Sequence, residues 1–359
     1  MVLLTQKQKD KFNQYIMDRY GTELNDFSDL LGDGYDEMSG LFYTHNKKYL
    51  HWLDGDPDKA IYKKEIIFRR RFYKLLKIVG PGVLKCKQVL ENTEPIILPD
   101  KPVIFVANHG FHDDALATVL AANRHAYFLI GSIPLLYNAI DGTALASVGG
   151  VIFNRKNKHS RAASINKCKK VMEYGTDIIL FPEGGWNKTS EIPVLKLWKG
   201  VYTLSLAARC DVVPITHYVR NMEILDRKNI IHTFIDNPIP LYELPEKDAM
   251  LYLREIMATR QWELMEKYGV STRSEELKGF DHSDEKWHAH LRERMKGVAR
   301  YDSSIEKKSD FRPKDIVYPE EVFKSIAEIS CVTPYNINDV IYARNLVKER
   351  TNNDFQRLY

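Results

Sequence analysis

Cysteine is scarce in this chain: its 359 residues include four, and none of them form the C-x-x-C spacing of zinc-binding motifs. They stand far apart in the sequence, at Cys86, Cys168, Cys210 and Cys331. Isolated cysteines predict neither a zinc site nor a disulfide framework. We therefore expect the protein to work in a reducing, cytoplasmic compartment.

Long hydrophobic runs are also missing. No uninterrupted apolar stretch of the sequence reaches the roughly 20 residues that a bilayer-crossing helix needs. The apolar patch within residues 1–10 is too short for a signal peptide. If the substrate is a lipid, we expect a protein without a transmembrane segment that reaches the inner membrane face from the cytoplasm, as a peripheral protein.

The chain also has little net charge. A formal charge of +4 over 359 residues argues against a nucleic-acid-binding protein, for which a strongly basic domain is expected. The sequence contains no Gly-x-Ser-x-Gly elbow either, the segment that presents a serine nucleophile in many hydrolases. A group transfer by this protein is therefore expected to be direct, without a covalent protein intermediate.

Apolar runs alternate with helical patterns between residues 95 and 245. The expected strands are 103–107, 126–130, 148–153, 177–181, 212–217 and 230–235, and the expected helices are 114–122, 135–146, 159–173 and 200–209. This alternation predicts an α/β fold with a mostly parallel sheet and helices on both faces. We divide the chain into an N-terminal helical region (1–94), an α/β core (95–245) and a C-terminal helical extension (246–359).

Residues 59–79 combine many basic side chains with a single acid, Glu65, and with interleaved aromatic and aliphatic residues. Such a basic amphipathic helix is typical of proteins that lie in a membrane interface. An ordinary helix with a solvated basic face has the same composition, so the pattern leaves both interpretations open. The histidines and carboxylates of residues 281–290 are interpreted as a solvated helix face, and no metal site is predicted.

The stretch 102–114 contains the strongest chemical signal. A run of mostly β-branched residues, typical of a strand buried on both faces, breaks at Asn108 and His109, and an apolar helical pattern begins at Asp114. The strand would carry His109 to its carboxyl end, where ligands gather in open α/β sheets. A turn would then let the Asp114 carboxylate orient the imidazole, as in the base–orienter pairs of acyl transfer.

Three further segments follow in order, each at the end of an expected strand. They are Gly149-Gly-Val-Ile-Phe-Asn-Arg155, Phe181-Pro-Glu-Gly184 and Val212-Val-Pro-Ile215. A guanidinium such as that of Arg155 matches a phosphate group with its planar fork of donors. Trp198-Lys-Gly200 opens the helix that follows the second segment, where Lys199 lies near a helix N-terminus.

Together these segments resemble the boxes of the glycerolipid acyltransferases, the family of lysophosphatidic acid and glycerol-3-phosphate acyltransferases. Asn108, His109 and Asp114 match its NH-x4-D box, and residues 181–184 match its F-P-E-G box. The resemblance covers about residues 95–240 and implies that His109 is a general base assisted by Asp114. It also implies a glycerol-3-phosphate acyltransferase-like fold.

The remaining boxes imply substrate contacts. The G-x-x-F-x-x-R element implies that Arg155 grips the phosphate of the acceptor, and the F-P-E-G box implies that Glu183 holds its hydroxyl groups. Asn108, Gly184 and Lys199 complete the substrate-binding set. The apolar-Pro-apolar strand implies that Pro214 shapes the acyl site.

The expected reaction moves a fatty acyl group from a thioester, acyl-CoA or acyl-ACP, to a lysophospholipid hydroxyl, most simply that of 1-acyl-glycerol-3-phosphate in phospholipid biosynthesis. The thioester is a co-substrate, no cofactor is expected, and acyl carrier protein is a candidate partner. Residues 185–187, Gly-Trp-Asn, replace the family's frequent Thr-Arg-Ser. This departure leaves open an acceptor without phosphate, such as a glycolipid, and a non-catalytic lipid-binding protein is the third alternative.

Overall fold

The computed structural model describes residues 57–111, 113–131, 147–153, 155, 158–185, 187, 193–220, 229–269 and 289. The described residues fall into two compact units. The first unit takes its described residues from 57–76 and 124–180, and the second from 77–123 and 181–269. The predicted helix at 135–146 and the histidine-containing segment 281–290, apart from Ala289, lie outside the described residues.

The second unit contains four strands in the order β1 (Lys87–Leu90), β7 (Ile230–Ile235), β6 (Val212–Tyr218) and β2 (Ile104–Ala107). β1 is parallel to β7 and β2 is parallel to β6, whereas β6 and β7 are antiparallel. Every residue of β2 and β6 is buried. Burial on both faces explains why these two strands are continuous apolar runs with little alternation.

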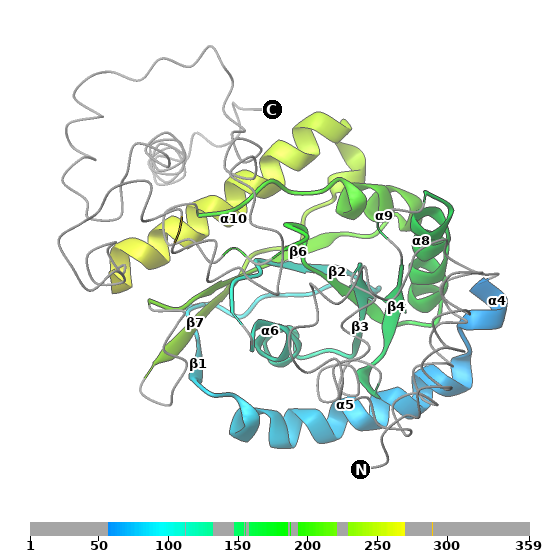
Figure 1. Cartoon of the computed structure of the whole chain (residues 1–359), viewed down its shortest axis with the longest axis horizontal. Coiled ribbons are helices and arrows are strands. Elements are labelled where there is room, and N and C mark those ends of the chain that lie inside the picture. The colour runs from blue at the N-terminus through cyan, green and yellow to red at the C-terminus, as the bar shows by residue number, and fades with distance from the viewer. Residues whose placement is uncertain are drawn as a thin grey trace. The chain divides into compact units, whose positions relative to one another are not determined.

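Helices cover both faces of these strands. Because side chains alternate along a strand, adjacent residues of β6 face opposite layers. His217 meets α6 (Asp114–Ala122), while the Tyr218 hydroxyl donates a hydrogen bond to the Gly269 carbonyl at the end of α10 (Glu246–Tyr268). α6 and α10 accordingly lie on opposite sides of β6 (Figure 1). The helices α9 (Gly200–Ala208) and η4 (Leu241–Glu243) complete this unit.

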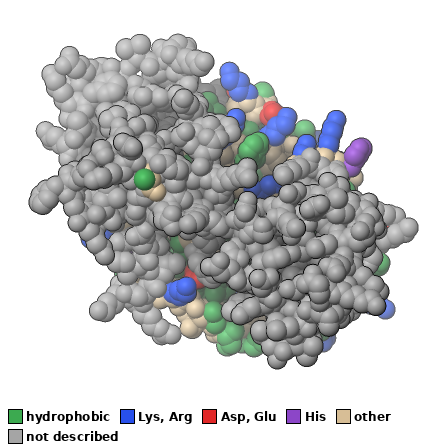
Figure 2. All heavy atoms as spheres, in the orientation of Figure 1, with side chains coloured by type: hydrophobic (Ala, Val, Ile, Leu, Met, Phe, Trp, Pro, Cys, Tyr) green, Lys and Arg blue, Asp and Glu red, His purple; other side chains and the backbone are tan. Residues whose placement is uncertain are grey.

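The first unit contains three parallel strands in the order β5 (Asp177–Leu180), β3 (Ala126–Ile130) and β4 (Gly150–Ile152). The helix α8 (Lys158–Glu173) packs on all three strands, and α4 (Pro57–Ala60) packs on α8. Figure 2 shows Lys, Arg and His side chains, together with an acidic one, on the described surface at the upper right of the view. In α8 the exposed basic side chains are those of Lys158, His159, Arg161 and Lys169.

A long helix, α5 (Lys63–Val83), begins in the first unit and ends in the second. Ile66, Arg69 and Tyr73 are buried, and their spacing of three and four residues defines one packed stripe. Large apolar residues on the rest of α5 are exposed, including Phe68 at 56% and Leu75 at 55%. No helix among the described residues combines the length and the hydropathy required to cross a bilayer.

The predicted fold class is confirmed, because most strand pairs in each unit are parallel and helices pack on them. The six predicted strands are all present, and their ends differ from the predicted ones by at most two residues. The strand β1 was not predicted. Its residues, Lys-Gln-Val-Leu, are partly exposed and only one of them is β-branched, so the segment lacks the apolar run of a central strand.

Candidate active site

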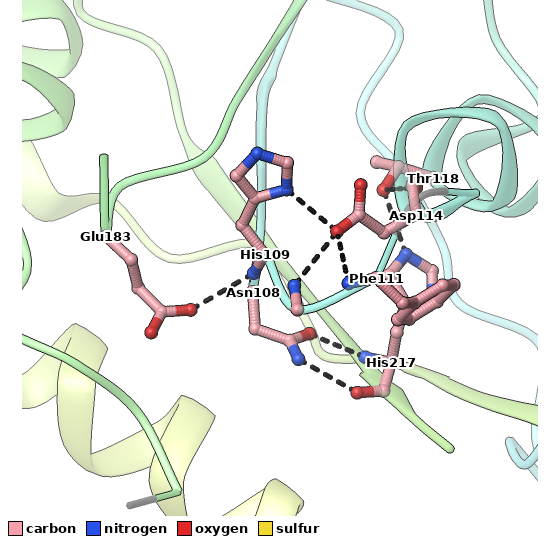
Figure 3. Close-up of polar contacts among 8 residues, drawn as sticks. Asn108, His109, Phe111, Asp114, Thr118, Glu183 and His217 are labelled. Carbon is pink, nitrogen blue, oxygen red and sulfur yellow. Dashed lines mark hydrogen bonds and ion pairs between the residues drawn. The ribbon is translucent and has the colours of Figure 1, made fainter. Parts of the chain in front are cut away.

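One carboxylate oxygen organises the turn between β2 and α6. Asp114 Oδ2 lies 2.7 Å from Nδ1 of His109, and it also accepts the backbone N–H groups of Gly110 at 2.9 Å and Phe111 at 3.2 Å (Figure 3). The Asp114 side chain is 1% exposed. The predicted pairing of His109 with Asp114 is therefore present, and the same carboxylate fixes the backbone of the turn that joins them.

The hydrogen bond to Asp114 determines the tautomer of His109. A carboxylate can only accept, so Nδ1 must carry the hydrogen, and the basic lone pair of the neutral ring is on Nε2. Nε2 points away from Asp114 (Figure 3). The ring is also held by stacking on Phe181, with centroids 4.3 Å apart and an angle of 21° between planes. This arrangement is suited to a general base oriented by a carboxylate.

Glu183 supports the same turn from the opposite side. Its Oε1 accepts the backbone N–H of His109 at 3.1 Å, and its Oε2 accepts that of Leu195 at 2.7 Å. The side chain is buried, and this burial raises the pKa of the Glu183 carboxyl to about 7. Glu183 thus links the histidine turn to residues 193–197, while its implied contact with acceptor hydroxyl groups stays a prediction.

Asn108 is tied to β6 rather than directed into open space. Its Nδ2 donates to the carbonyl of His217 at 2.8 Å, and its Oδ1 accepts the N–H of the same residue at 2.7 Å. The amide of Asn108 therefore forms two hydrogen bonds with the backbone of β6, at the residue just before His109. Its predicted role in substrate binding remains a prediction.

Gly184 and its neighbours form a tight loop after β5. Gly184 has φ of +70°, and a Cβ atom there would lie 2.7 Å from Cδ1 of Trp198. The position requires glycine both for its backbone conformation and for the close approach of the indole. Lys199 takes the N-cap position of α9, where its Nζ is 3.3 Å from Glu246.

Two predicted residues lie outside this turn. Pro214 is buried in β6, where it pairs with Val106 of β2 and accepts the N–H of Asp236 at 2.9 Å. Arg155 belongs to the first unit, after β4, and its carbonyl accepts a hydrogen bond from Arg161 of α8. The structure thus brings Asn108, His109, Asp114, Glu183 and Gly184 together within the second unit. The roles of Pro214 and Arg155 remain predictions.

The sequence interpretation missed His217, Thr118 and Thr233, which form buried hydrogen bonds next to the dyad. His217 Nε2 is 2.9 Å from Thr118 Oγ1, and His217 Nδ1 is 2.9 Å from Thr233 Oγ1. A signal was present, because His217 interrupts a strand whose other residues are mainly apolar. Its partners come from α6 and β7, so the sequence alone does not identify them.

Comparison with known proteins agrees with this geometry. Residues 87–218 match the family model described as Acyltransferase. The chain is 40% identical over 129 residues to a 1-acyl-sn-glycerol-3-phosphate acyltransferase of Borreliella burgdorferi. The aligned residues make up 36% of this chain and 50% of that protein. The chain is 29% identical over 126 residues to a protein of the same name in Chlamydomonas reinhardtii, covering 35% of this chain and 36% of that one.

Among solved structures, the chain is similar to the 1-acyl-sn-glycerophosphate acyltransferase PlsC of Thermotoga maritima. The TM-score is 0.45 at 20% identity, with 65% of this chain and 90% of that chain covered. The matched part of this chain spans 36% and 50% of the Chlamydomonas and Borreliella proteins. The resemblance to the glycerolipid acyltransferases is confirmed for the matched segment, which contains every predicted site residue.

The pKa of Glu183 predicts a pH-dependent stability. Because its pKa in the folded state is about 7, above the ordinary value of 4.5 for a glutamate, the folded state binds more protons between these two values. The stabilisation is complete below pH 4.5 and is lost as the pH rises through 7. We expect the free energy of unfolding to fall by a few kcal/mol, in order of magnitude, across this interval from this group alone.

Urea denaturation of wild type and Glu183→Gln at pH 5 and pH 8 would test this expectation. The variant should be less stable at both values, because its amide N–H₂ faces a backbone N–H, but its stability should change less with pH. Glu266→Gln, an exposed substitution on α10, serves as the control and should retain the wild-type slope. An unchanged slope in Glu183→Gln would contradict the assignment.

Proposed function

We propose that this protein is an O-acyltransferase that transfers an acyl group from a thioester to the hydroxyl of a lysophospholipid-type acceptor, in phospholipid biosynthesis. The observation that carries the proposal is the 2.7 Å hydrogen bond between His109 Nδ1 and Asp114 Oδ2, which places the ring hydrogen on Nδ1 and makes Nε2 the basic nitrogen of the imidazole. The match of residues 87–218 to the Acyltransferase family model supports it. The names of the relatives support 1-acyl-glycerol-3-phosphate as the acceptor.

The proposed reaction is a direct transfer. Nε2 of His109 takes the proton of the acceptor hydroxyl while the oxygen attacks the thioester carbonyl, and the imidazolium that forms is stabilised by Asp114. The tetrahedral intermediate then collapses, the C–S bond breaks, and the imidazolium returns the proton to the departing thiolate. The products are an ester and a free thiol, from CoA or acyl carrier protein, and this chemistry uses no cofactor.

Arg155 is proposed to bind the phosphate of the acceptor. It stands in the turn between β4 and α8, where Lys158, His159 and Arg161 follow closely in the sequence. All three of these side chains are exposed. A guanidinium among other cations favours a dianionic headgroup over a neutral one. The Gly185-Trp-Asn187 segment favours the alternative, an acceptor without phosphate.

The exposed side of α5 is proposed to contact anionic lipid. Phe68, Phe72 and Leu75 follow helical spacing and are exposed, and Phe68 and Phe72 stack edge to face with centroids 5.1 Å apart. Lys64 and Arg71 are exposed at positions four residues before and three after Phe68, so they flank this stripe. An apolar stripe beside cations matches the interface of a membrane that contains anionic headgroups.

Replacement of His109 tests the reaction. His109→Gln should lower the rate of free-thiol release from acyl-CoA by about 10²- to 10⁴-fold, because a general base typically contributes this factor. His232→Gln is the matched control, since His232 Nδ1 lies 2.8 Å from Glu91 outside the histidine turn. This control should keep wild-type turnover. Near-normal turnover in a folded His109→Gln protein would reject the proposal.

An acceptor panel tests the phosphate contact. Wild type should prefer 1-acyl-glycerol-3-phosphate to a monoacylglycerol. Arg155→Ala should raise KM for the phosphorylated acceptor by about ten- to a hundredfold, the value of one charged hydrogen bond, and leave the monoacylglycerol unaffected. Lys158→Ala, a neighbouring loss of one charge, should have a smaller effect. A wild-type preference for the neutral acceptor would favour the glycolipid alternative.

Vesicle flotation tests the lipid contact. The triple variant Phe68→Ser, Phe72→Ser, Leu75→Ser should bind vesicles of phosphatidylcholine and phosphatidylglycerol at least about tenfold more weakly, because each apolar side chain contributes about 1 kcal/mol or more on burial. Leu206→Ser, which changes an exposed leucine on α9, should bind like wild type. Equal binding by the triple variant and wild type would exclude α5 as the lipid contact.

A further inference from the structure

A series of hydrogen-bonded polar side chains, all buried except the half-buried Gln88, runs from β1 to the turn that carries His109. Gln88 Nε2 of β1 donates to Thr233 Oγ1 of β7 at 3.0 Å, and Thr233 contacts His217 of β6. His217 in turn contacts Thr118 of α6. Thr118 Oγ1 then donates to the backbone carbonyl of Asp114 at 2.7 Å. The series thus joins three strands and one helix, and it ends at Asp114, whose carboxylate orients His109.

The donor and the acceptor of each hydrogen bond in this series can be assigned. Thr118 has a single hydroxyl hydrogen, and it is committed to the Asp114 carbonyl, so the Nε2 of His217 must donate to Thr118 Oγ1. Nδ1 of His217 must then accept from the hydroxyl of Thr233. Gln88 donates to a lone pair of Thr233 Oγ1. His217 is therefore a neutral imidazole with its hydrogen on Nε2, the opposite tautomer from that of His109.

The surroundings of His217 keep it neutral. Its side chain is almost fully buried, and burial lowers the pKa of the His217 imidazole to about 4. The edge of the Phe111 ring packs against it, with centroids 6.2 Å apart. A second proton on Nδ1 would point at the hydrogen that the Thr233 hydroxyl donates to this nitrogen. The direction of each hydrogen bond in this series is therefore the same across the physiological pH range.

His217 holds both partners of the catalytic pair through their neighbours. Its backbone N–H and carbonyl bind the side chain of Asn108, the residue just before His109. Its ring binds Thr118, one helical turn after Asp114. An apolar side chain would fill the same space without desolvating a polar ring. A stabilising role in packing alone therefore does not explain an imidazole at this position.

We propose that His217, acting through Asn108 and Thr118, is a positioning residue that sets the distance and angle between His109 and Asp114. The inference rests on the proposed acyltransferase function, in which this geometry determines the rate. A misplacement of reacting groups of about 1 Å can cost about a hundredfold in rate. The effect is expected on kcat, because no substrate contact is assigned to the side chains of His217, Thr118 and Thr233.

Two matched pairs of variants test the proposal. Thr118→Val removes the hydroxyl between His217 and Asp114 at nearly constant volume and should lower kcat about tenfold, and His217→Phe should lower it about a hundredfold. Thr118→Ser and His217→Gln each retain a donor and acceptor and should restore most of kcat. KM for acyl-CoA and for the acceptor should stay within about twofold in all four variants.

The control uses the same strand. Thr216→Val replaces a threonine beside His217 that is fully buried on the other face of β6, and whose hydroxyl has no hydrogen-bond partner among the described residues. This variant should keep wild-type kcat. Rates are compared per folded molecule, at a temperature below the melting transition of every variant measured by circular dichroism.

Imidazole nitrogen NMR gives a readout that loss of stability would not change. In wild type, His217 should show a proton on Nε2 and His109 a proton on Nδ1. In folded Thr118→Val and His217→Phe, His109 should show both tautomers. The proposal is overturned if His217 carries its proton on Nδ1, if the His109 signal is the same in these variants, or if their kcat stays within about twofold of wild type.

The two proposals can fail separately. If wild type releases no thiol with any acceptor of the panel, the acyltransferase function is rejected. The NMR spectra still decide whether His217 fixes the geometry of the histidine–aspartate pair. If wild type is active and the spectra of the variants match it, the positioning role alone is rejected.

Discussion

The site depends on one acceptor atom, Asp114 Oδ2. Three N–H groups, one from an imidazole and two from the backbone, converge on it within 3.2 Å. In a buried position these charge-assisted bonds are stronger than in water, so the turn and the histidine tautomer are fixed by the same charge. The same turn is also contacted by Glu183, Asn108 and Phe181. These contacts add to a backbone conformation that the Asp114 carboxylate stabilises. Loss of the charge would therefore alter the backbone as well as the ring.

The fold was largely predictable because its strands carry a local signal. β2 and β6 are buried on both faces, and their sequences are apolar runs. Asn108 and His109 follow directly after β2. The family boxes then identified His109, Asp114 and Glu183. β1 gave no such signal, since its residues are half exposed and its place in the sheet depends on pairing with β7, far along the chain.

The supporting contacts of the site were not predictable for a related reason. Hydrogen bonds of Glu183 go to the backbone of residues 12 and 74 positions away, and those of His217 reach Thr118, 99 residues away. Sequence patterns report periodicity and spacing within one element, whereas these contacts depend on how elements pack together. The box sequences therefore predicted which side chains meet at the turn, and the three-dimensional structure shows which contacts hold them.

The antiparallel pairing of β6 with β7 has a consequence for the time at which this site forms. Asn108 and Asp114 are bound through β6, and β6 in turn is bordered by β7, whose residues begin at Ile230. During synthesis the histidine and aspartate leave the ribosome more than a hundred residues before the strand that braces them. Contacts of such wide sequence separation form late, because loop closure must precede them. A nascent chain that ends before β7 would contain His109 and Asp114 without the strand that borders β6, so their geometry should become fixed only once β7 has joined the sheet.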